Sequence, residues 1–283
     1  MGAQRLEQEY DLAVAYLEGG AAYYVSSYVK SKKKVVFIHT DYILAGYNRG
    51  LDEDCYLNYD KVFTISKNVK ERFLSVYPEC RKYTDVFLNR IDREGIISKA
   101  KVKGGFSDCY NGFRILTVGR LVPEKIHDIA IQAMKILKST GGDFRWYVLG
   151  EGVLRKKLER TIKMLGLEKE FFLLGAVDNP FPYYAQCDLY VHTTLLEGKS
   201  VAVQEAQILG CPILVTEYNG VCEQIEDGVS GKICKPEPEV IAENILYLVN
   251  HPWLLKSYRE AALEKSQTDN QREVEKLIRM LAV

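Results

Sequence analysis

The sequence of 283 residues lacks an excess of either charge, because 38 lysine and arginine residues balance 38 aspartate and glutamate residues. This balance argues against binding of nucleic acid through bulk charge, and leaves only a local basic patch open. The chain also lacks an apolar run of transmembrane length. Its N-terminal segment shows no basic stretch followed by an apolar signal core, so we expect a cytoplasmic protein.

The seven cysteines are never spaced as C-x-x-C, and several lie in apolar runs. This pattern favours buried free thiols in a reducing compartment over disulfides. No cluster of histidine, cysteine or carboxylate residues has the spacing of metal ligands, and we interpret His127 and His192 as structural. The segment Gly150–Gly152 lacks the third glycine of a dinucleotide fingerprint. The sequence therefore predicts neither a metal site nor a dinucleotide cofactor.

What the sequence does contain is 47% apolar and 27% charged residues, which is typical of a globular chain with a sizeable core. Its first third alternates short apolar runs with helical stretches. We expect strands at 11–17, 34–39, 61–65 and 84–88, with helices at 21–29 and 67–77. Such runs, separated by helices, predict a parallel sheet covered on both faces. The run Lys30–Lys34 is interpreted as a solvated turn, with a membrane-surface contact as the less favoured interpretation.

A second α/β series follows a linker of turn-forming residues at 104–112. The expected strands are 113–118, 144–149, 171–174, 188–192, 212–216 and 231–234. The expected helices are 126–138, 153–165, 182–186, 201–209, 240–248 and 252–280. The sequence thus predicts an N-terminal Rossmann-like domain at 1–108 and a second Rossmann-like domain at 109–283, with the last helices packing back on the first domain. In such sheets ligands bind beyond the carboxyl ends of the strands.

One of these strand ends carries two carboxylates, Glu197 and Glu205, with seven residues between them. Ser200 is a preferred N-cap residue for the helix that would begin at Val201. The amides of Lys199 to Val201 would then lie at the positive end of the helix dipole, which suits a phosphate. Carboxylates accept hydrogen bonds from hydroxyl groups, so the segment predicts a site for a sugar joined to a phosphate. The spacing alone is weak, because about one such pair is expected by chance in a chain of this length.

Two further strand ends carry polar residues that suit the same ligand. Gly119, Arg120 and Lys125 lie where one strand turns into the next helix, and two cations there suit a diphosphate. The alternative is a solvated pair of surface cations. His39 ends a strand of the first domain and precedes polar residues, although a lone histidine is more often a satisfied core residue.

Four segments of the second domain together resemble glycosyltransferase family 4, which comprises retaining enzymes of the GT-B fold. They are GRLVPEK at 119–125, LGEGVLRKKLE at 149–159, LLEGKSVAVQEA at 195–206 and NGVCEQIEDGVSGKIC at 219–234. The first domain matches more loosely, through VFTISKNVKERFLSVYP at 62–78 and VFLNRID at 86–92. The family usually has more βα units at the start of that domain, so the resemblance implies that the first domain here is shortened.

The resemblance implies a hexosyltransferase-type enzyme of polysaccharide biosynthesis that uses a nucleotide diphosphate sugar, with no metal and no other cofactor. It implies that Gly119, Arg120, Lys125, Ser200 and Val201 bind the donor diphosphate. Glu205 would bind the ribose, and the catalytic pair would be Glu197 at the donor sugar and His39 facing it.

The implied acceptor is a glycan or a lipid-linked glycan, which would place the protein in the cytoplasm or at the inner face of the membrane, without nucleic acid. Two other functions are open. One is a nucleotide-sugar-binding protein without transferase activity, because its N-terminal domain is incomplete. The other is an epimerase or phosphorylase of the same fold, although no cofactor lysine of a phosphorylase can be located.

Overall fold

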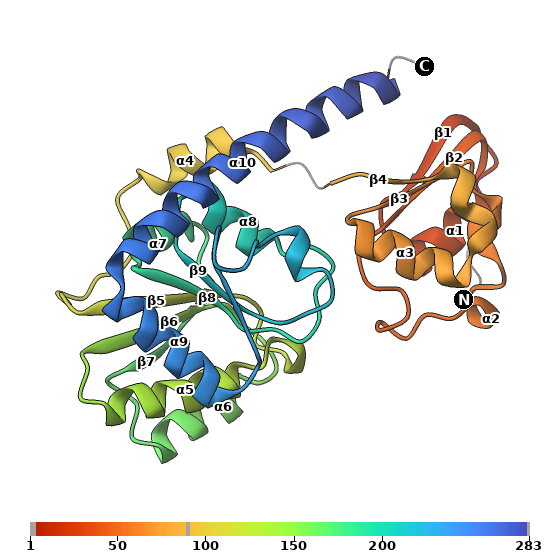
Figure 1. Cartoon of the computed structure of the whole chain (residues 1–283). Helices are drawn as coiled ribbons and strands as arrows, with labels where there is room; N and C mark the ends of the chain where they lie inside the picture. The colour runs from red at the N-terminus through yellow and green to blue at the C-terminus, as the bar shows by residue number, and fades with distance from the viewer. Residues whose placement is uncertain (1–3, 89–90, 282–283) are drawn as a thin grey trace. The chain divides into compact units, whose positions relative to one another are not determined.

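The structure is a computed structural model that describes residues 4–88 and 91–281, with the side chains of 267–274 and 276–281 outside that description. The chain divides into two compact units (Figure 1). The first comprises residues 1–89 and 197–199, and the second comprises 90–196 and 200–283.

The first unit contains a four-stranded parallel sheet in the order β1-β2-β3-β4. Its elements are β1 (Glu9–Ala15), α1 (Gly20–Tyr28), β2 (Lys30–Ile38), α2 (Arg49–Asp52), η1 (Cys55–Asn58), β3 (Lys61–Thr64), α3 (Lys67–Val76), η2 (Pro78–Tyr83) and β4 (Thr84–Val86). The expected helix cap at Ser66 is confirmed, because its side chain accepts a hydrogen bond from the Val69 amide at 3.1 Å. That the first domain is shortened relative to the resembled family stays a prediction.

The interpretation of Lys30–Lys34 as a turn is wrong, because these residues form the first half of β2. Their backbone pairs in parallel with β1, from Glu9 opposite Lys30 to Ala13 opposite Lys34. Lys32 forms an ion pair with Asp11 of β1 at 2.6 Å. Pairing with a neighbouring strand thus overrides the local preference of a lysine-rich run for a turn.

The helices of the first unit contribute to a core on one face of its sheet. Ala15, Val36 and Val62 point to that face and pack with Phe73 of α3 and with a set of buried tyrosines. Side chains alternate along a strand, so Leu12 and Val14 point to the opposite face. Their side chains are 52% and 45% exposed. On that face the edge strand β1 therefore keeps apolar residues in contact with solvent, whereas Phe37 of β2 and Phe63 of β3 are buried.

The second unit contains a six-stranded parallel sheet in the order β10-β9-β8-β5-β6-β7. Its strands are β5 (Phe113–Val118), β6 (Phe144–Leu149), β7 (Phe171–Gly175), β8 (Leu189–His192), β9 (Ile213–Thr216) and β10 (Lys232–Cys234). Its helices are α4 (Arg93–Ala100), η3 (Pro123–Lys125), α5 (His127–Ser139), α6 (Arg155–Met164), α7 (Phe181–Gln186), α8 (Val201–Ile208), η4 (Val221–Glu223), α9 (Pro238–Asn250) and α10 (Pro252–Leu281). The prediction of an α/β protein with two parallel sheets is confirmed.

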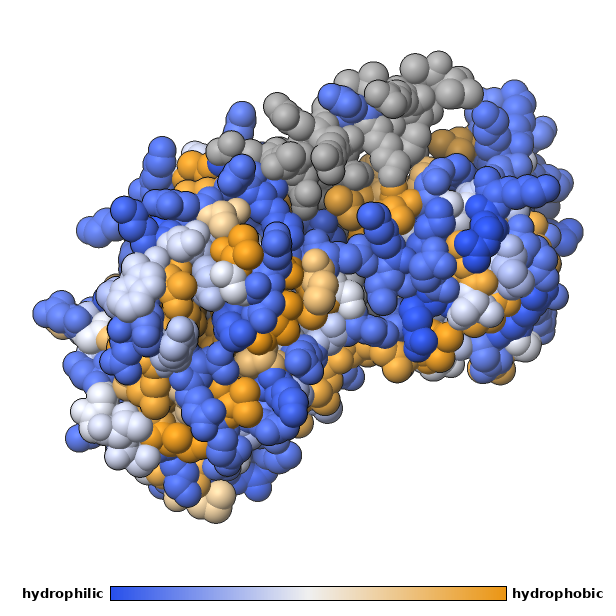
Figure 2. Space-filling view, in the orientation of Figure 1, coloured by the Kyte–Doolittle hydropathy of each residue, from blue (hydrophilic) through white to orange (hydrophobic). Residues whose placement is uncertain are grey.

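Helices cover both faces of this second sheet (Figure 1). On one face Trp146 and Val148 of β6 pack with α5, α6 and α9. On the other face Tyr147 and Leu149 of β6 pack with α7 and α8. Outside these cores, hydrophilic residues cover most of the face seen in Figure 2, with apolar patches between them. The strand order reverses between β5 and β8, and at such a point a crevice opens beyond the carboxyl ends of the two strands.

The division into units falls between residues 89 and 90, before the linker expected at 104–112. The reason is α4, a helix that the sequence reading missed and that packs on α7 and α8. Asn179 donates a hydrogen bond to the Lys99 carbonyl at 2.9 Å, and Gln186 donates one to the Gly104 carbonyl at 2.9 Å. The expected linker therefore lies against the second sheet. The packing of the last helices on the first domain stays a prediction.

Candidate functional site

Two loops are joined at the point where the second sheet reverses its order. One loop follows β5 and contains η3, and the other leads from β8 to α8. The Leu195 amide donates a hydrogen bond to the Glu124 carbonyl at 2.9 Å. The Thr193 hydroxyl donates to the Lys125 carbonyl at 2.9 Å, and the Thr194 hydroxyl donates to the Glu124 carbonyl at 3.2 Å. These bonds bring the two groups of residues predicted from separate motifs into one place.

Gly119 lies at the start of the loop after β5, and it has no side chain to fill the space beside Lys125. The Lys125 side chain runs beside it, since a Cβ at Gly119 would lie 3.8 Å from its Cδ and Cε atoms. Gly150 has a φ of 146° and approaches from β6, so that a Cβ on it would lie 2.0 Å from the Gly119 carbonyl oxygen. A side chain at Gly150 would therefore push the Gly119–Arg120 turn out of position.

Lys125 and Arg120 supply two positive groups here. Burial, and then the nearby Arg120, lower the pKa of Lys125 to about 8. Arg120 itself is exposed. A lysine with this pKa is still mostly protonated at neutral pH, and it gains a favourable contact when an anion arrives.

The N-terminus of α8 is built as the sequence predicts, with one difference. Ser200 is the N-cap, and its hydroxyl accepts a hydrogen bond from the Val203 amide at 3.4 Å. We expected the amide of Ser200 to be exposed, but it donates to the side chain of Gln224 at 2.7 Å, because Ser200 is buried against that residue. The first amides of a helix have no acceptor within it, so Val201 and Ala202 provide the donors of this helix end.

Glu205 lies one turn into α8 from those amides. Its carboxylate accepts a hydrogen bond from the Tyr184 hydroxyl at 3.1 Å. Burial raises the pKa of Glu205, and the bond from Tyr184 opposes that shift. The carboxylate is therefore partly desolvated, and has acceptor capacity left for hydroxyl groups of a ligand.

His192, which the sequence reading set aside as structural, lies directly beneath the N-cap. Its Nε2 atom is 3.2 Å from the Ser200 hydroxyl and its Nδ1 atom is 3.0 Å from the Tyr190 hydroxyl. Burial, and then the charges of Lys125 and His127, lower the pKa of His192 well below its usual value. The neutral ring thus connects the N-cap to β8. Its position at the end of a strand was the available signal.

Two predicted residues fall in the first unit. His39 follows β2, and Glu197 belongs to the segment 197–199. The sequence reading missed Glu18, which accepts hydrogen bonds from the His39 amide at 2.9 Å and the Thr40 hydroxyl at 2.6 Å. Burial alone would raise the pKa of Glu18, but the bonds from His39 and Thr40 lower it to about 2. An ionised carboxylate therefore lies beside His39, with its oxygen 3.8 Å from the histidine Nδ1 atom.

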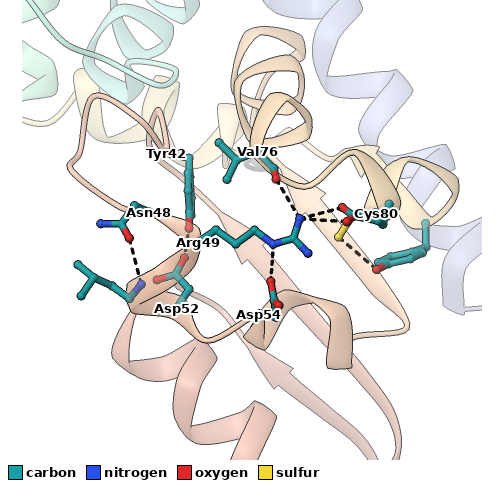
Figure 3. Close-up of polar contacts among 10 residues, drawn as sticks. Tyr42, Asn48, Arg49, Asp52, Asp54, Val76 and Cys80 are labelled. Atoms are coloured by element: carbon teal, nitrogen blue, oxygen red, sulfur yellow. Dashed lines mark hydrogen bonds and ion pairs between the residues drawn. The ribbon is translucent and has the colours of Figure 1, made fainter.

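The segment after His39 is held by a buried carboxylate (Figure 3). Asp52 of α2 accepts hydrogen bonds from the hydroxyls of Tyr42 and Tyr23. Asn48 caps the same helix by accepting from the Leu51 amide at 3.0 Å. Arg49 projects the other way, to Asp54, Glu79 and the Val76 carbonyl. This cluster has its polar groups satisfied from within, which identifies it as the support of the loop.

Two kinds of feature are absent from the described part of the chain. Among residues 4–88 and 91–281, apart from those whose side chains lie outside the description, no group of three or more histidine, cysteine or carboxylate residues could hold a metal ion. No helix in the same ranges is both long enough and apolar enough to cross a membrane.

Comparison with known families gives one match to a family model. The model describes glycosyl transferases group 1, and it matches residues 110–265, which is more than half of the chain. The matched segment contains Arg120, Lys125, Glu197 and Glu205.

Comparison with curated proteins gives relatives that are longer than this chain. The N-acetylgalactosamine-N,N'-diacetylbacillosaminyl-diphospho-undecaprenol 4-alpha-N-acetylgalactosaminyltransferase of Campylobacter jejuni is 29% identical over 222 residues, which are 78% of this chain and 59% of that protein. The amylovoran biosynthesis glycosyltransferase AmsK of Erwinia amylovora is 35% identical over 126 residues, which are 42% of this chain and 31% of that protein. The chain thus spans 59% or less of these relatives.

Comparison with solved structures supports the fold. HepE from Anabaena, solved in complex with UDP, aligns with a TM-score of 0.78 at 22% identity and covers 94% of this chain and 78% of that one. TarM aligns with a TM-score of 0.71 at 20% identity, over 89% of this chain and 51% of that one.

Proposed function

Because this chain belongs to the glycosyl transferases group 1 family, we propose that it transfers a sugar from a nucleoside diphosphate sugar to an acceptor. One observation carries the proposal. Two cations and a helix N-terminus meet at the carboxyl ends of β5 and β8, where the strand order of the sheet reverses. Such a place binds phosphate groups through charge and backbone amides.

In this proposal the donor diphosphate lies over Gly119, which has no side chain to obstruct it. Arg120 binds it through two parallel N–H groups, and Lys125 binds it as a point charge. The amide of Val201 and the partial positive charge of the α8 N-terminus complete the cradle. The Ser200 amide is bonded to Gln224, so Ser200 contributes through its hydroxyl.

The remaining parts of the donor are assigned to the carboxylates. Glu205 lies one turn along α8 from the phosphate cradle and accepts hydrogen bonds from the ribose hydroxyls. Glu197 accepts hydrogen bonds from the hydroxyls of the donor sugar. His39, supported by Glu18, faces that sugar.

The chemical step breaks the bond between the sugar anomeric carbon and the diphosphate oxygen. Negative charge then gathers on the leaving diphosphate, and Arg120, Lys125 and the helix N-terminus stabilise it without a metal ion. The acceptor hydroxyl attacks from the face that the diphosphate leaves, and its proton passes to a diphosphate oxygen. The product retains the configuration of the donor sugar.

The acceptor is proposed from the relatives. The C. jejuni protein is named for a diphospho-undecaprenol substrate, and AmsK is named for amylovoran biosynthesis. We therefore propose a glycan or lipid-linked acceptor at the cytoplasmic face of a membrane, reached through peripheral contact.

Calorimetry with UDP, GDP, ADP and TDP, with and without EDTA, tests the donor site, and hydrolysis of the matching nucleotide sugar tests turnover. We expect one nucleotide to bind with a Kd of about 1–100 μM, as is usual for enzyme substrates, and we expect EDTA to leave that affinity unchanged. No binding of any of the four would reject the donor site. Binding with no turnover, even with lipid-linked and free glycan acceptors, would reject the transferase.

A further inference from the structure

Gln224 makes an unusual pair of contacts with the backbone of the N-cap residue. Its Oε1 atom accepts a hydrogen bond from the Ser200 amide at 2.7 Å, and its Nε2 atom donates to the Ser200 carbonyl at 2.9 Å. The side-chain amide therefore pairs with the backbone N–H and C=O of one residue, as a neighbouring strand would. Gln224 is 2% exposed and Ser200 is 3% exposed, so water does not compete for these bonds.

Two further bonds fix Gln224 itself. The Tyr218 hydroxyl donates to its Oε1 atom at 2.9 Å, and the Gln207 side chain donates to its carbonyl oxygen at 2.8 Å. Gln207 lies near the end of α8, so the helix is attached to Gln224, the residue that follows η4, at two points: its N-cap Ser200 and Gln207. Ser200, Gln207, Tyr218 and Gln224 are all buried, so these hydrogen bonds are shielded from water.

The pairing decides which groups of α8 face a ligand. It occupies the Ser200 amide, and leaves the outward direction to the amides of Val201 and Ala202. It also fixes the end of the segment that carries Glu197, whose beginning is held by the bond from the Thr194 hydroxyl to the Leu196 carbonyl at 3.1 Å. A shift of the N-cap would therefore move the phosphate donors together with that segment.

We propose that Gln224 is a positioning residue for the diphosphate, which it serves by holding the N-terminus of α8 in register with Arg120 and Lys125. This role rests on the proposed donor site. Gln224 itself does not contact the diphosphate in this proposal; it acts through its hydrogen bonds with the Ser200 backbone.

The experiment compares Gln224→Leu with Gln207→Leu, and measures the affinity for UDP and UMP by calorimetry and the melting temperature by differential scanning fluorimetry. Both substitutions remove buried amide bonds of the same cluster, but only the first releases the Ser200 peptide. We expect Gln224→Leu to weaken UDP binding about tenfold and UMP binding less than about threefold, because the second phosphate meets the helix end. Gln207→Leu removes one bond that fixes Gln224 but leaves its pairing with Ser200 intact, so it should weaken UDP binding by less than about threefold and should not distinguish UDP from UMP.

A second variant, Gln224→Glu, keeps the acceptor for the Ser200 amide and removes the donor to its carbonyl. It should weaken UDP binding at least as much, because it also brings a negative charge near the phosphates, and it remains informative if the leucine variant does not fold. Unchanged UDP affinity, an equal loss for UMP, or an equal loss in Gln207→Leu would overturn the role of Gln224. Failure of the wild-type protein to bind UDP or any other nucleoside diphosphate would instead overturn the donor site, and with it this role.

Discussion

The two parallel sheets of this protein differ in how their strands are ordered. In the first unit the strands run β1-β2-β3-β4, in the order of the chain. In the second unit the chain starts in the middle with β5, proceeds to β7 at one edge, and returns to β8 on the other side of β5. Only a reversal of this kind turns successive connections to opposite faces and opens a crevice at the strand ends. The donor site is therefore expected on the second sheet.

The sheets also differ in their cores. Each face of the second sheet has its own large buried cluster, whereas the large cluster of the first sheet lies on one face, and its other face has buried rings at Phe37 and Phe63 but exposed residues on β1. Parallel sheets are usually covered on both faces. The first sheet thus leaves Leu12 and Val14 of its edge strand β1 exposed to solvent, while the second sheet is covered on both faces and can support a rigid site.

The sharpest test of this comparison is the replacement of one arginine in each unit. Arg120→Ala should weaken UDP binding by about 10- to 100-fold, because it removes a charge-assisted bidentate contact. Arg72→Ala in the first unit, where Arg72 pairs with Asp41 at 3.1 Å, should leave UDP affinity unchanged. Calorimetry measures both. Equal effects of the two substitutions would remove the distinction between the units.

The difference in cores predicts a difference in stability. Val148→Thr places a hydroxyl in a fully buried position of β6, and should lower the free energy of unfolding by about 1–3 kcal/mol. Val14→Thr makes the same chemical change on the open face of β1, and should alter it by less than about 0.5 kcal/mol. Urea denaturation followed by circular dichroism measures both. A loss at Val14 as large as that at Val148 would mean that this face is covered in solution.

The position of Glu205 on α8 predicts that the site distinguishes ribose from deoxyribose. Glu205→Ala should weaken UDP binding about tenfold and have little effect on 2′-deoxy-UDP, because the carboxylate accepts hydrogen bonds from adjacent ribose hydroxyls. Gln204→Ala, at the preceding position of α8, is the matched control and should change neither affinity. If Glu205→Ala weakened both nucleotides alike, the carboxylate would have a role other than hydroxyl binding.

The last prediction concerns pH, and at pH 8 itself its effect is small. The pKa of Lys125 is about 8 without a ligand, and a bound diphosphate must raise it. The diphosphate therefore binds best to the protonated lysine, and this form is lost as the pH rises above 8. UDP affinity should therefore hold steady from pH 6.5 to 7.5 and fall by at most about tenfold per pH unit above pH 8. Lys125→Arg should remove this fall, because arginine stays charged. A wild-type affinity that is flat to pH 9.5 would contradict the assignment.

Local patterns in the sequence were sufficient for much of this picture. The caps at Ser66 and Ser200 follow from a hydroxyl residue before an apolar-periodic run, and both are present. The strand-end position of Arg120 follows from an apolar run that stops at glycine. These features depend on residues within one or two turns of the chain, which is the range that a pattern can describe.

Other features depend on distant partners and could not be found in this way. Gln224 is 24 residues from Ser200, and nothing near it in the sequence indicates their pairing. Glu18 follows an apolar run and precedes two glycines, which indicates a turn instead of a partner for His39. The helix α4 was missed because Ile96 is its single buried residue, so it shows no apolar stripe. The strand orders likewise follow from long-range pairing.

The cysteines have a practical consequence. All seven are free thiols, and five of them are buried. The two exposed thiols are Cys109 and Cys222, and Cys222 lies in η4, two residues before Gln224. After Cys109→Ser, a maleimide fluorophore would label Cys222 alone in the native protein. Its emission would report, in real time and without any substrate turnover, whether the arrival of a nucleotide disturbs the attachment of α8.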